Sequence, residues 1–312
     1  MLIAVAIGAA VVVAALLAWG HFEAGWVRLD RLECPLERLP AELDGLTIVH
    51  LSDLHLGFPS RGERAVRHAA DWTAERDPDL TAVTGDLLSR RRGEPLLREL
   101  MRGLPRCYAV LGNHDFAETK DPFASRSPVG DLAPARLLLD ETVTLELRGK
   151  RVQLVGVDPR SYRRGRARPA ERADPSADVR ILLCHYPDVA DRLQEGAFDL
   201  ILAGHLHAGQ ITLPLPGRRV PLAHPRWRFV RGLFERRGGI VHVSAGLGTT
   251  FVPFRFLARP EATELVLRSA SRSASSALRR RNGGEERPRR GALEVWRIQI
   301  ARLCQSFNRR AP

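Results

Sequence analysis

The chain has 312 residues, of which 44% are apolar and 27% charged, a composition that belongs to globular proteins and excludes wholesale disorder. Its four cysteines, at positions 34, 107, 184 and 304, form no C-x-x-C pair, which disfavours a zinc ribbon, a thioredoxin-type site and a disulfide framework. The net charge of +12 is concentrated in residues 268–312, which contain twelve Arg against three Glu, so the basic character belongs to an appendage and not to the globular part.

The first element is an uninterrupted apolar run at residues 2–19. As a helix it would reach about 27 Å, which is enough to cross the hydrocarbon core of a bilayer. A cleaved signal peptide is the alternative, but no basic residue precedes the run and no clean A-x-A site follows it. We therefore predict a transmembrane anchor over residues 1–20. Arg28, Arg31 and Arg38 follow the anchor, and the positive-inside rule then places the rest of the chain in the cytoplasm.

After a connector at residues 21–43, strand patterns alternate with helix patterns. Ser60 and Glu63 have the spacing of a capping box and predict a helix that runs to Arg76, and Pro95 opens a second helix that stops at Gly103. This alternation predicts an α/β layered fold with its helices outside. Short apolar, β-branched runs predict the strands, at 46–52, 79–85, 107–112, 152–157, 180–184, 199–203, 240–244 and 262–267.

The tail at residues 269–312 is rich in Ser, Arg and Gly, and this composition predicts disorder. Residues 292–304 have the apolar spacing of one amphipathic helix, which would lie on anionic lipid; a solvated tail with a marginal helix is the alternative. The arginine clusters lack interleaved aromatic residues and a recognised module, so we expect no nucleic-acid partner.

Polar side chains follow five of the predicted strands, at the point where each strand ends. In open α/β sheets this edge is where ligands bind, and carboxylates mixed with imidazoles suit Zn, Mn or Fe. Each motif alone is ordinary, since Gly-Asp after a strand is usually a turn and a single His is usually structural. The five together predict a metal site. Its candidates are Asp53, His55, Asp86, Asn113, His114, Asp115, His185, His205 and His207.

Other signals of catalysis are missing from the sequence. It contains no Gly-rich P-loop, which disfavours nucleotide-driven phosphoryl transfer, and no G-x-S-x-G elbow. The histidines outside the strand-end pattern are interpreted as structural, namely His21, His50, His68, His224 and His242.

The motifs DLH, GDL, GNHD, LLCHYPD and GHLHAGQ resemble those of the calcineurin-like metallophosphoesterases over roughly residues 44–268. The stretches LVGVD, AGHLHAGQITLPLPG and VSAGLGTTFVPFRFLARPE are similar to the bacterial membrane-tethered branch that includes UDP-2,3-diacylglucosamine diphosphatases. The resemblance implies a four-layered αββα sandwich at residues 44–268 and a place in the bacterial inner membrane. It also implies two divalent metal ions, whose identity among Mn, Fe, Zn and Co the ligand types leave open.

By motif position, the resemblance assigns the ligands to two ions. Asp53, His55 and His207 hold the first, Asn113, His185 and His205 hold the second, and Asp86 bridges both. It further implies that His114 lies beside the scissile phosphate as general acid or charge stabiliser, oriented by Asp115. This chain departs from the last family motif at Leu206 and Ala208, where the family usually has a small polar residue and a glycine. The departure leaves the ligand types intact but changes their surroundings.

The sequence therefore predicts a membrane-anchored, binuclear metal-dependent phosphoesterase. It would hydrolyse a phosphodiester or pyrophosphate bond in a lipid- or nucleotide-linked substrate by attack of a metal-bridging hydroxide, because two cations neutralise the substrate and lower the pKa of a shared water. Residues 211–236 combine Pro, Arg and apolar side chains and predict a substrate rim, with an ordinary surface loop as the alternative. Its phosphate contacts would be Arg218, Arg219, Arg226 and Arg228.

Three other functions stay open at the level of sequence. One is a phosphodiesterase on soluble substrates, such as cyclic nucleotides or general diesters. Another is a non-catalytic scaffold that keeps the metal site for binding, which the complete set of ligands disfavours. The last is a nuclease. The oligomeric state is not indicated.

Overall fold

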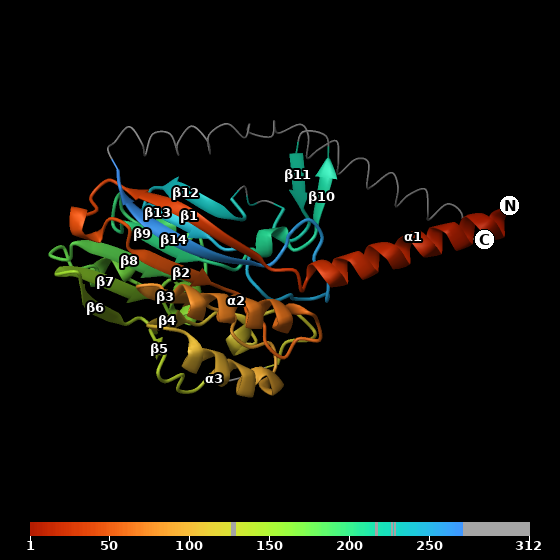
Figure 1. The fold of residues 1–312 in the computed structure, drawn as a ribbon, viewed down its shortest axis with the longest axis horizontal. Coiled ribbons are helices and arrows are strands. Elements are labelled where there is room, and N and C mark those ends of the chain that lie inside the picture. Colours follow the sequence, from red (N-terminus) through yellow and green to blue (C-terminus); the bar gives the residue numbers. More distant parts are fainter. Residues whose placement is uncertain (126–128, 216–217, 226, 228, 271–312) are drawn as a thin grey trace.

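The computed structural model describes residues 1–270 apart from 126–128, 216–217, 226 and 228, and omits the side chains of residues 218 and 219. The described part is built on two six-stranded sheets and a two-stranded hairpin (Figure 1). The predicted amphipathic helix at 292–304 lies outside the described residues.

The first sheet has the order β1 (Arg28–Leu36), β14 (Glu261–Ser269), β2 (Thr47–Leu51), β3 (Leu80–Thr84), β4 (Cys107–Val110) and β5 (Arg136–Leu137). The second has the order β12 (Gly232–Arg236), β13 (Gly239–Val243), β9 (Leu200–Ala203), β8 (Val179–Leu183), β7 (Lys150–Gly156) and β6 (Thr142–Leu147), and the hairpin pairs β10 (Thr212–Leu215) with β11 (Arg218–Pro221).

The two sheets pack face to face, and this confirms the predicted α/β sandwich. Apolar side chains from both sheets form one buried cluster between them, for example Ile48 and Val110 from the first and Ile181 and Leu202 from the second. Helices α2 (Gly62–Arg76) and α3 (Glu94–Gly103) cover the outer face of the first sheet. In the part of the chain that the structure describes, the outer face of the second sheet carries two short helices, α4 (Pro159–Arg163) and α5 (Val189–Arg192). Single 3-10 turns occur at Ala41–Leu43, Arg91–Gly93, His114–Phe116, Pro169–Arg172 and His207–Gly209.

Two local features differ from the expectation. Residues 21–43, expected as a connector, contain β1, an edge strand that pairs in parallel with β14; its alternating charges hide the strand pattern.

The capping box before α2 does not form. The Ser60 hydroxyl accepts a hydrogen bond from the Gly62 N–H at 3.1 Å, and the Glu63 carboxylate accepts one from the Gly57 N–H at 3.3 Å. Glu63 thus holds the preceding loop instead of the helix start.

The direction of the strands decides where the loops gather. In the first sheet β2, β3, β4 and β5 run parallel, and in the second β7, β8, β9 and β13 do. The carboxyl ends of parallel strands meet at one edge of a sheet, so each sheet collects its strand-end loops on one side.

Helix α1 (Leu2–Glu23) projects from one end of the sandwich (Figure 1). Residues 1–19 are exposed, and within the described residues α1 is the one helix long and apolar enough to cross a membrane. Its last turn is different because it is packed into the domain. Gly20 and Glu23 are buried, the Gly20 carbonyl accepts from the Arg255 N–H at 3.0 Å, and the Glu23 carboxylate accepts from the Ala258 N–H at 2.8 Å.

Candidate metal centre

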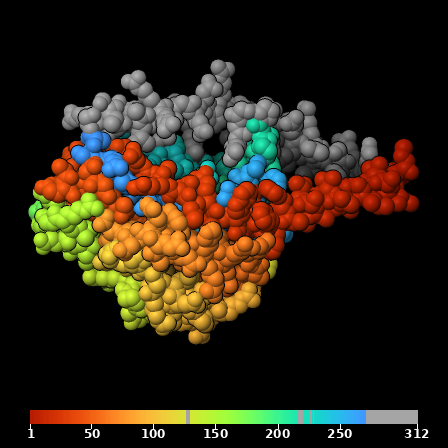
Figure 2. Space-filling view, in the orientation of Figure 1, coloured from red at the N-terminus to blue at the C-terminus, as the bar shows by residue number. Residues whose placement is uncertain are grey.

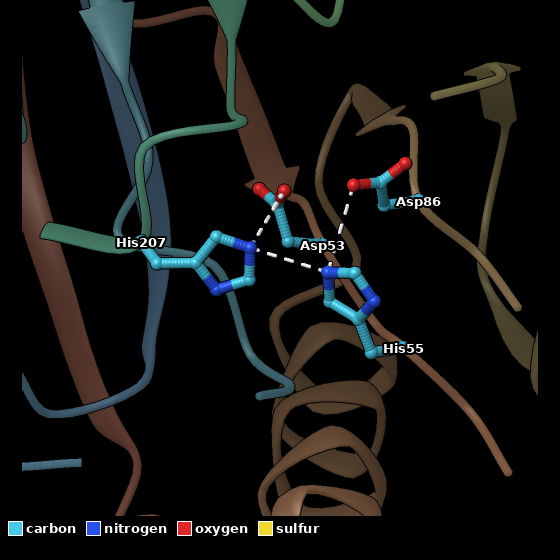
Figure 3. Close-up of side chains that lie close together, drawn as sticks. All are labelled: Asp53, His55, Asp86 and His207. Carbon is cyan, nitrogen blue, oxygen red and sulfur yellow. Dashed lines mark hydrogen bonds and ion pairs between the residues drawn. The ribbon is translucent and has the colours of Figure 1, made fainter. Parts of the chain in front are cut away.

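The first ligand group consists of Asp53, His55, Asp86 and His207, all buried and directed at a common point (Figure 3). The Nε2 atoms of His55 and His207 lie 3.2 Å apart. Nε2 of His207 lies 3.3 Å from an oxygen of Asp53, and Nε2 of His55 lies 3.6 Å from an oxygen of Asp86. One donor atom from each residue lies within 4.8 Å of those of the others, which is the spacing that a single cation requires.

The second group shares Asp86 and adds side chains that follow strands of the second sheet. Nε2 of His185 lies 3.3 Å from the Asp86 carboxylate and 3.2 Å from Nδ1 of His205. The amide oxygen of Asn113 lies 3.2 Å from the same nitrogen. All seven residues expected as ligands therefore converge, and Asp86 stands between the two groups as a bridging ligand would.

The backbone is strained where the ligands sit. Asp53, His55, Asp86, His205 and His207 all have φ between 46° and 74°, in the left-handed region that non-glycine residues rarely adopt. Such conformations cost about 1–3 kcal/mol each and persist where the surrounding structure enforces them, commonly at functional sites. This strain is a sign of a functional site that is independent of the residue types.

Glycines beside the ligands let the backbone approach closely. A β-carbon on Gly204 would collide with the hydroxyl of Ser52 and the carboxylate of Asp53. A β-carbon on Gly112 would collide with the carboxylate of Asp86. The Gly in the GNHD and GHLH motifs is therefore a packing requirement of the neighbouring ligand.

Two of the candidate ligand histidines, His55 and His185, are held by a hydrogen bond at the second ring nitrogen. Nδ1 of His55 pairs with the Ser89 hydroxyl at 3.0 Å, and Nδ1 of His185 pairs with the Thr84 carbonyl at 2.9 Å, which leaves the Nε2 atoms for the centre. His205 is turned the other way and directs Nδ1 at the centre. These partners fix ring orientation, as outer groups commonly do around metals.

The two departures from the family motif have separate structural effects. Leu206 is fully buried in the apolar layer outside the second sheet, where a polar side chain would have to find a partner. Ala208 has φ of 50°, so an alanine occupies a left-handed position that favours glycine. Neither change moves His205 or His207 out of the ligand groups.

The protonation of the cluster suits metal ions. Burial raises the pKa of Asp86, but the charges of His185 and His114 outweigh it and hold the pKa well below the usual value. Burial lowers the pKa of His55 well below its usual value and that of His205 to about 3. Burial also acts on His185, but there the Asp86 carboxylate dominates and raises the pKa to about 9. Ionised carboxylates and neutral imidazoles are the forms that bind divalent cations, and the carboxylate of Asp86 and the imidazoles of His55 and His205 are already in these forms. A cation bound beside His185 would displace the proton that Asp86 stabilises on that ring, so the donor set fits two divalent ions whose binding releases a proton.

His114 lies beside the ligand groups without joining them. Its ring stands edge-on to that of His55 at 4.6 Å between centroids, and its backbone N–H donates to the Asp86 carboxylate at 2.8 Å. Its buried Nδ1 has no hydrogen-bond partner, and burial lowers the pKa of the ring. A buried polar atom without a partner next to a ligand cluster is a candidate for contact with substrate.

Asp115 occupies a different place from the one expected. Its carboxylate accepts from the backbone N–H groups of Leu88 and Gly112 at 2.9 and 2.8 Å. The residue therefore fastens the loop after β3 to the loop after β4, and within the described residues no hydrogen bond joins it to the ring of His114. The expected orienting contact is replaced by a bond between loops.

The four arginines expected to bind substrate are only partly located. The backbone of Arg218 and Arg219 belongs to β11, paired with Leu215 and Pro214 of β10. Arg226 and Arg228 lie outside the described residues. Their contacts with substrate stay a prediction.

Two residues near the centre escaped the sequence analysis. His224, interpreted as structural, places its ring 5.0 Å from that of His205. Arg255 is fully buried and donates to the carbonyls of Ala245, Gly246, Gly248 and Ala258, with one of its nitrogens 3.4 Å from Nδ1 of His207. Arg255 lies in one of the stretches that carry the family resemblance and His224 lies in the predicted substrate rim, but the sequence indicates this role for neither, because both lie in irregular segments and not at the end of a predicted strand.

Comparison with known proteins agrees with this geometry. The family model described as calcineurin-like phosphoesterase matches residues 46–209. The uncharacterized metallophosphoesterase YkoQ of Bacillus subtilis is 31% identical over 70% of this chain and 82% of its own length. A transmembrane protein with a metallophosphoesterase domain from Danio rerio is 32% identical over 77% of this chain, which spans 57% of that protein. The UDP-2,3-diacylglucosamine pyrophosphatase LpxG of Chlamydia muridarum is 27% identical over 81% of this chain and 93% of its own length.

Proposed function

We propose, on the premise that this chain belongs to the calcineurin-like phosphoesterases and is a phosphoester hydrolase, that it acts at a membrane surface on a lipid-linked phosphodiester or pyrophosphate. The family and the ligand cluster support the reaction class. The membrane location and the substrate are the parts proposed here.

In this proposal Asp53, His55, Asp86, Asn113, His185, His205 and His207 would hold two divalent ions. Such a pair neutralises an anionic phosphate and makes water nucleophilic near neutral pH. The protein's own contribution begins with Asp86, which orients both groups through one carboxylate. His114, with its unpartnered Nδ1, would hydrogen-bond the phosphoryl oxygen or protonate the leaving oxygen.

The observation that carries the lipid proposal is an apolar rim of exposed side chains, which includes residues of the hairpin β10–β11 and of the turn after α1. The hairpin lies at the end of the domain from which α1 leaves (Figure 1), and Figure 2 shows the same end of the molecule in space-filling form. Large apolar side chains are exposed there although the rest of the described domain buries its apolar groups. The rim consists of Trp26, Leu213, Leu215, Leu222 and Phe251.

The rim is tied to both the anchor and the centre. Trp26 stands edge-on to Trp19 of α1 at 6.4 Å between ring centroids. Gln210, three residues after His207, donates to the carbonyls of Thr250 and Val252 on either side of Phe251. An apolar surface that joins a membrane-type helix to the ligand loops is the arrangement expected of an enzyme that takes its substrate from lipid.

The chemical identity of the substrate is proposed from the LpxG relatives, whose name states a UDP-2,3-diacylglucosamine pyrophosphatase. A pyrophosphate bond joins two phosphates, and two cations suit the double negative charge. We extend this substrate class, a nucleotide diphosphate linked to an acylated sugar, to the present chain.

The test compares two substrates on the full chain in detergent, loaded with Mn²⁺. UDP-2,3-diacylglucosamine should be hydrolysed with kcat/KM at least about 100-fold above that of the soluble bis(p-nitrophenyl) phosphate. A double change, Leu213→Gln with Leu215→Gln, should lower the rate on the lipid and leave the soluble diester unaffected. Equal kcat/KM on both substrates would support the soluble-substrate alternative.

The same proposal places the domain in the cytoplasm, because Arg28 and Arg31 follow the helix on that side. A C-terminal alkaline phosphatase fusion in a bacterial host should be inactive, and a fluorescent protein fusion should be bright. The reverse pattern would put the domain outside the cytoplasm.

A further inference from the structure

A cavity lies at the foot of α1. It has a volume of about 480 Å³ and is lined by His21, Phe58, Pro59, Ser60, Arg61, Glu63 and Arg92. We call it the foot pocket. None of its lining residues belongs to the candidate metal ligands. Its walls come from α1, from the loop before α2 with the first turn of that helix, and from the turn before α3.

The depth of the foot pocket follows from the docking of α1. His21 lies two residues beyond Trp19, the last residue of the apolar run, and thus about 3 Å further along the helix axis. The headgroup layer on each side of a bilayer is about 5–8 Å thick. Because Gly20 and Glu23 are buried in the domain, the helix end and the pocket keep one fixed relation. If residues 2–19 span the hydrocarbon core, the pocket opens at headgroup level.

The charges of the foot pocket suit an anion. Arg61 and Arg92 are two guanidinium groups in its wall, and in the described part of the chain neither has a carboxylate within 4 Å. Arg92 is held by one hydrogen bond, from Nε to the Gly57 carbonyl at 2.7 Å, and Arg61 lies over the ring of Phe22 at 5.8 Å. The one acidic lining residue, Glu63, already accepts from the Gly57 N–H. The remaining guanidinium N–H groups are available to a phosphate.

We infer that the foot pocket binds the phosphate group of an anionic membrane lipid. This inference rests on the proposed membrane location of α1. The site differs from the metal centre in its donors, which are guanidinium groups. Its occupant would therefore be a bound lipid and not a molecule to be hydrolysed. Free phosphate shares the chemistry, so the experiment has to separate the two sources.

The experiment titrates the full chain in dodecyl maltoside with dihexanoyl-phosphatidylglycerol below its micelle concentration, and separately with inorganic phosphate, by calorimetry. Changing Arg61→Gln together with Arg92→Gln should weaken the lipid by about tenfold or more. Glu63→Gln should tighten it about twofold, because it removes a like charge. The matched control is Arg67→Gln with Arg102→Gln, the same change of charge at exposed positions on α2 and α3.

The outcomes separate the possibilities. If the pocket variant weakens the lipid but not phosphate, the site recognises a headgroup; if it weakens both equally, the site takes any phosphate, which also supports the inference. If the pocket variant behaves as the control does, the inference is wrong. Membrane fractionation of the cells is read independently: a soluble full chain would overturn the proposed anchor, whereas an anchored chain with an inert pocket would overturn only this site.

Discussion

At the scale of single residues, the centre depends on backbone conformations that the side chains do not favour. Five ligands adopt positive φ, and glycines beside them permit contacts that no β-carbon would allow. The strained backbone persists because hydrogen bonds between neighbouring loops hold it, as those of Asp115 do between the loops after β3 and β4. Substitutions next to the ligands should therefore be as damaging as substitutions of the ligands.

Gly204→Ala tests this point. The new methyl group collides with Ser52 and Asp53, so we expect weaker metal binding by about 10- to 100-fold while the chain stays folded. The measurement is competitive metal titration with a chromogenic chelator. Gly103→Ala, at a position with open space around the added carbon, is the control and should bind metal as the wild type does.

Asp86 and His114 should be separable by experiment. Asp86→Asn should lose metal and activity together, because both ligand groups share this carboxylate. His114→Ala should keep its metal and lose about 10²–10⁴-fold in kcat. Metal content by mass spectrometry and steady-state kinetics decide the matter. Near-full activity of His114→Ala on a substrate with a poor leaving group would exclude the role assigned to this residue.

A pair of buried histidines predicts the response to acid. Nδ1 of His50 lies 2.7 Å from Nδ1 of His242, and this contact joins β2 to β13 across the sandwich. Burial lowers the pKa of both, that of His242 to about 3. In the unfolded chain both imidazoles have an ordinary pKa near 6.5, so below that pH they bind protons that the folded chain does not bind. The contribution of the pair to the free energy of unfolding is therefore complete above about pH 6.5 and decreases as the pH falls towards 3.

Between about pH 6.5 and pH 3, each of these two histidines lowers the free energy of unfolding by about 1.4 kcal/mol for every unit by which the pH is decreased. His242→Gln keeps a partner for His50 and removes one titrating group. Between pH 6 and pH 5 it should therefore lose about 1 kcal/mol less than the wild type, measured by urea unfolding. Parallel pH curves for the two proteins would contradict this account.

At the scale of elements, the segment from Ala245 to Ala258 connects α1 to the candidate metal centre. Its backbone binds the last turn of α1 through Gly20, and the guanidinium of Arg255 gathers its carbonyls around His207. Only a planar group with several N–H donors satisfies so many buried carbonyls at once. Arg255 is thus a positioning residue for a ligand and not itself a ligand.

Arg255→Lys keeps the charge but leaves several carbonyls without donors. We expect a loss of about 2–4 kcal/mol in unfolding free energy, together with weaker metal binding, both measured on the full chain in detergent. Arg102→Lys, in the exposed last turn of α3, is the control. Loss of stability with unchanged metal affinity would show that Arg255 supports the fold alone.

The elements also show how far the sequence could be interpreted. The buried strands β2, β3, β4, β8 and β9 were predictable because their apolar runs end in polar ligands. The hairpin β10–β11 and the strands β1, β5, β6 and β12 were not, since edge strands have mixed composition and rely on partners far away in sequence. The candidate ligands follow buried strands, so the sequence could name the residues that converge. Arg255, His224 and the bonds of Asp115 required the folded loops.

At the scale of the whole molecule, the candidate ligands of the centre come from both sheets. Asp53, His55, Asp86 and Asn113 follow strands of the first sheet, and His185, His205 and His207 follow strands of the second. Ions bound there would link the two halves of the sandwich, so binding and folding are coupled.

Metal removal should therefore lower the thermal stability. An ion present at about 100 times its Kd contributes about 2.7 kcal/mol to the folded state, which corresponds to several degrees in Tm for a domain of this size. Calorimetric melting of the full chain with EDTA and with added Mn²⁺ measures the difference. The Asp86→Asn variant should melt at the same temperature in both.

The rigid joint between α1 and the domain has one more consequence. Helix α1 joins the sandwich without a flexible linker, because Gly20 and Glu23 are packed against the segment that carries Arg255. In a bilayer such a joint would set a single height for the ligand cluster above the acyl chains. The distance from a lipid's glycerol or sugar to its phosphorus atoms would then decide which bond reaches the ligand cluster. A lipid with a shorter or longer headgroup would place a different bond at the cluster.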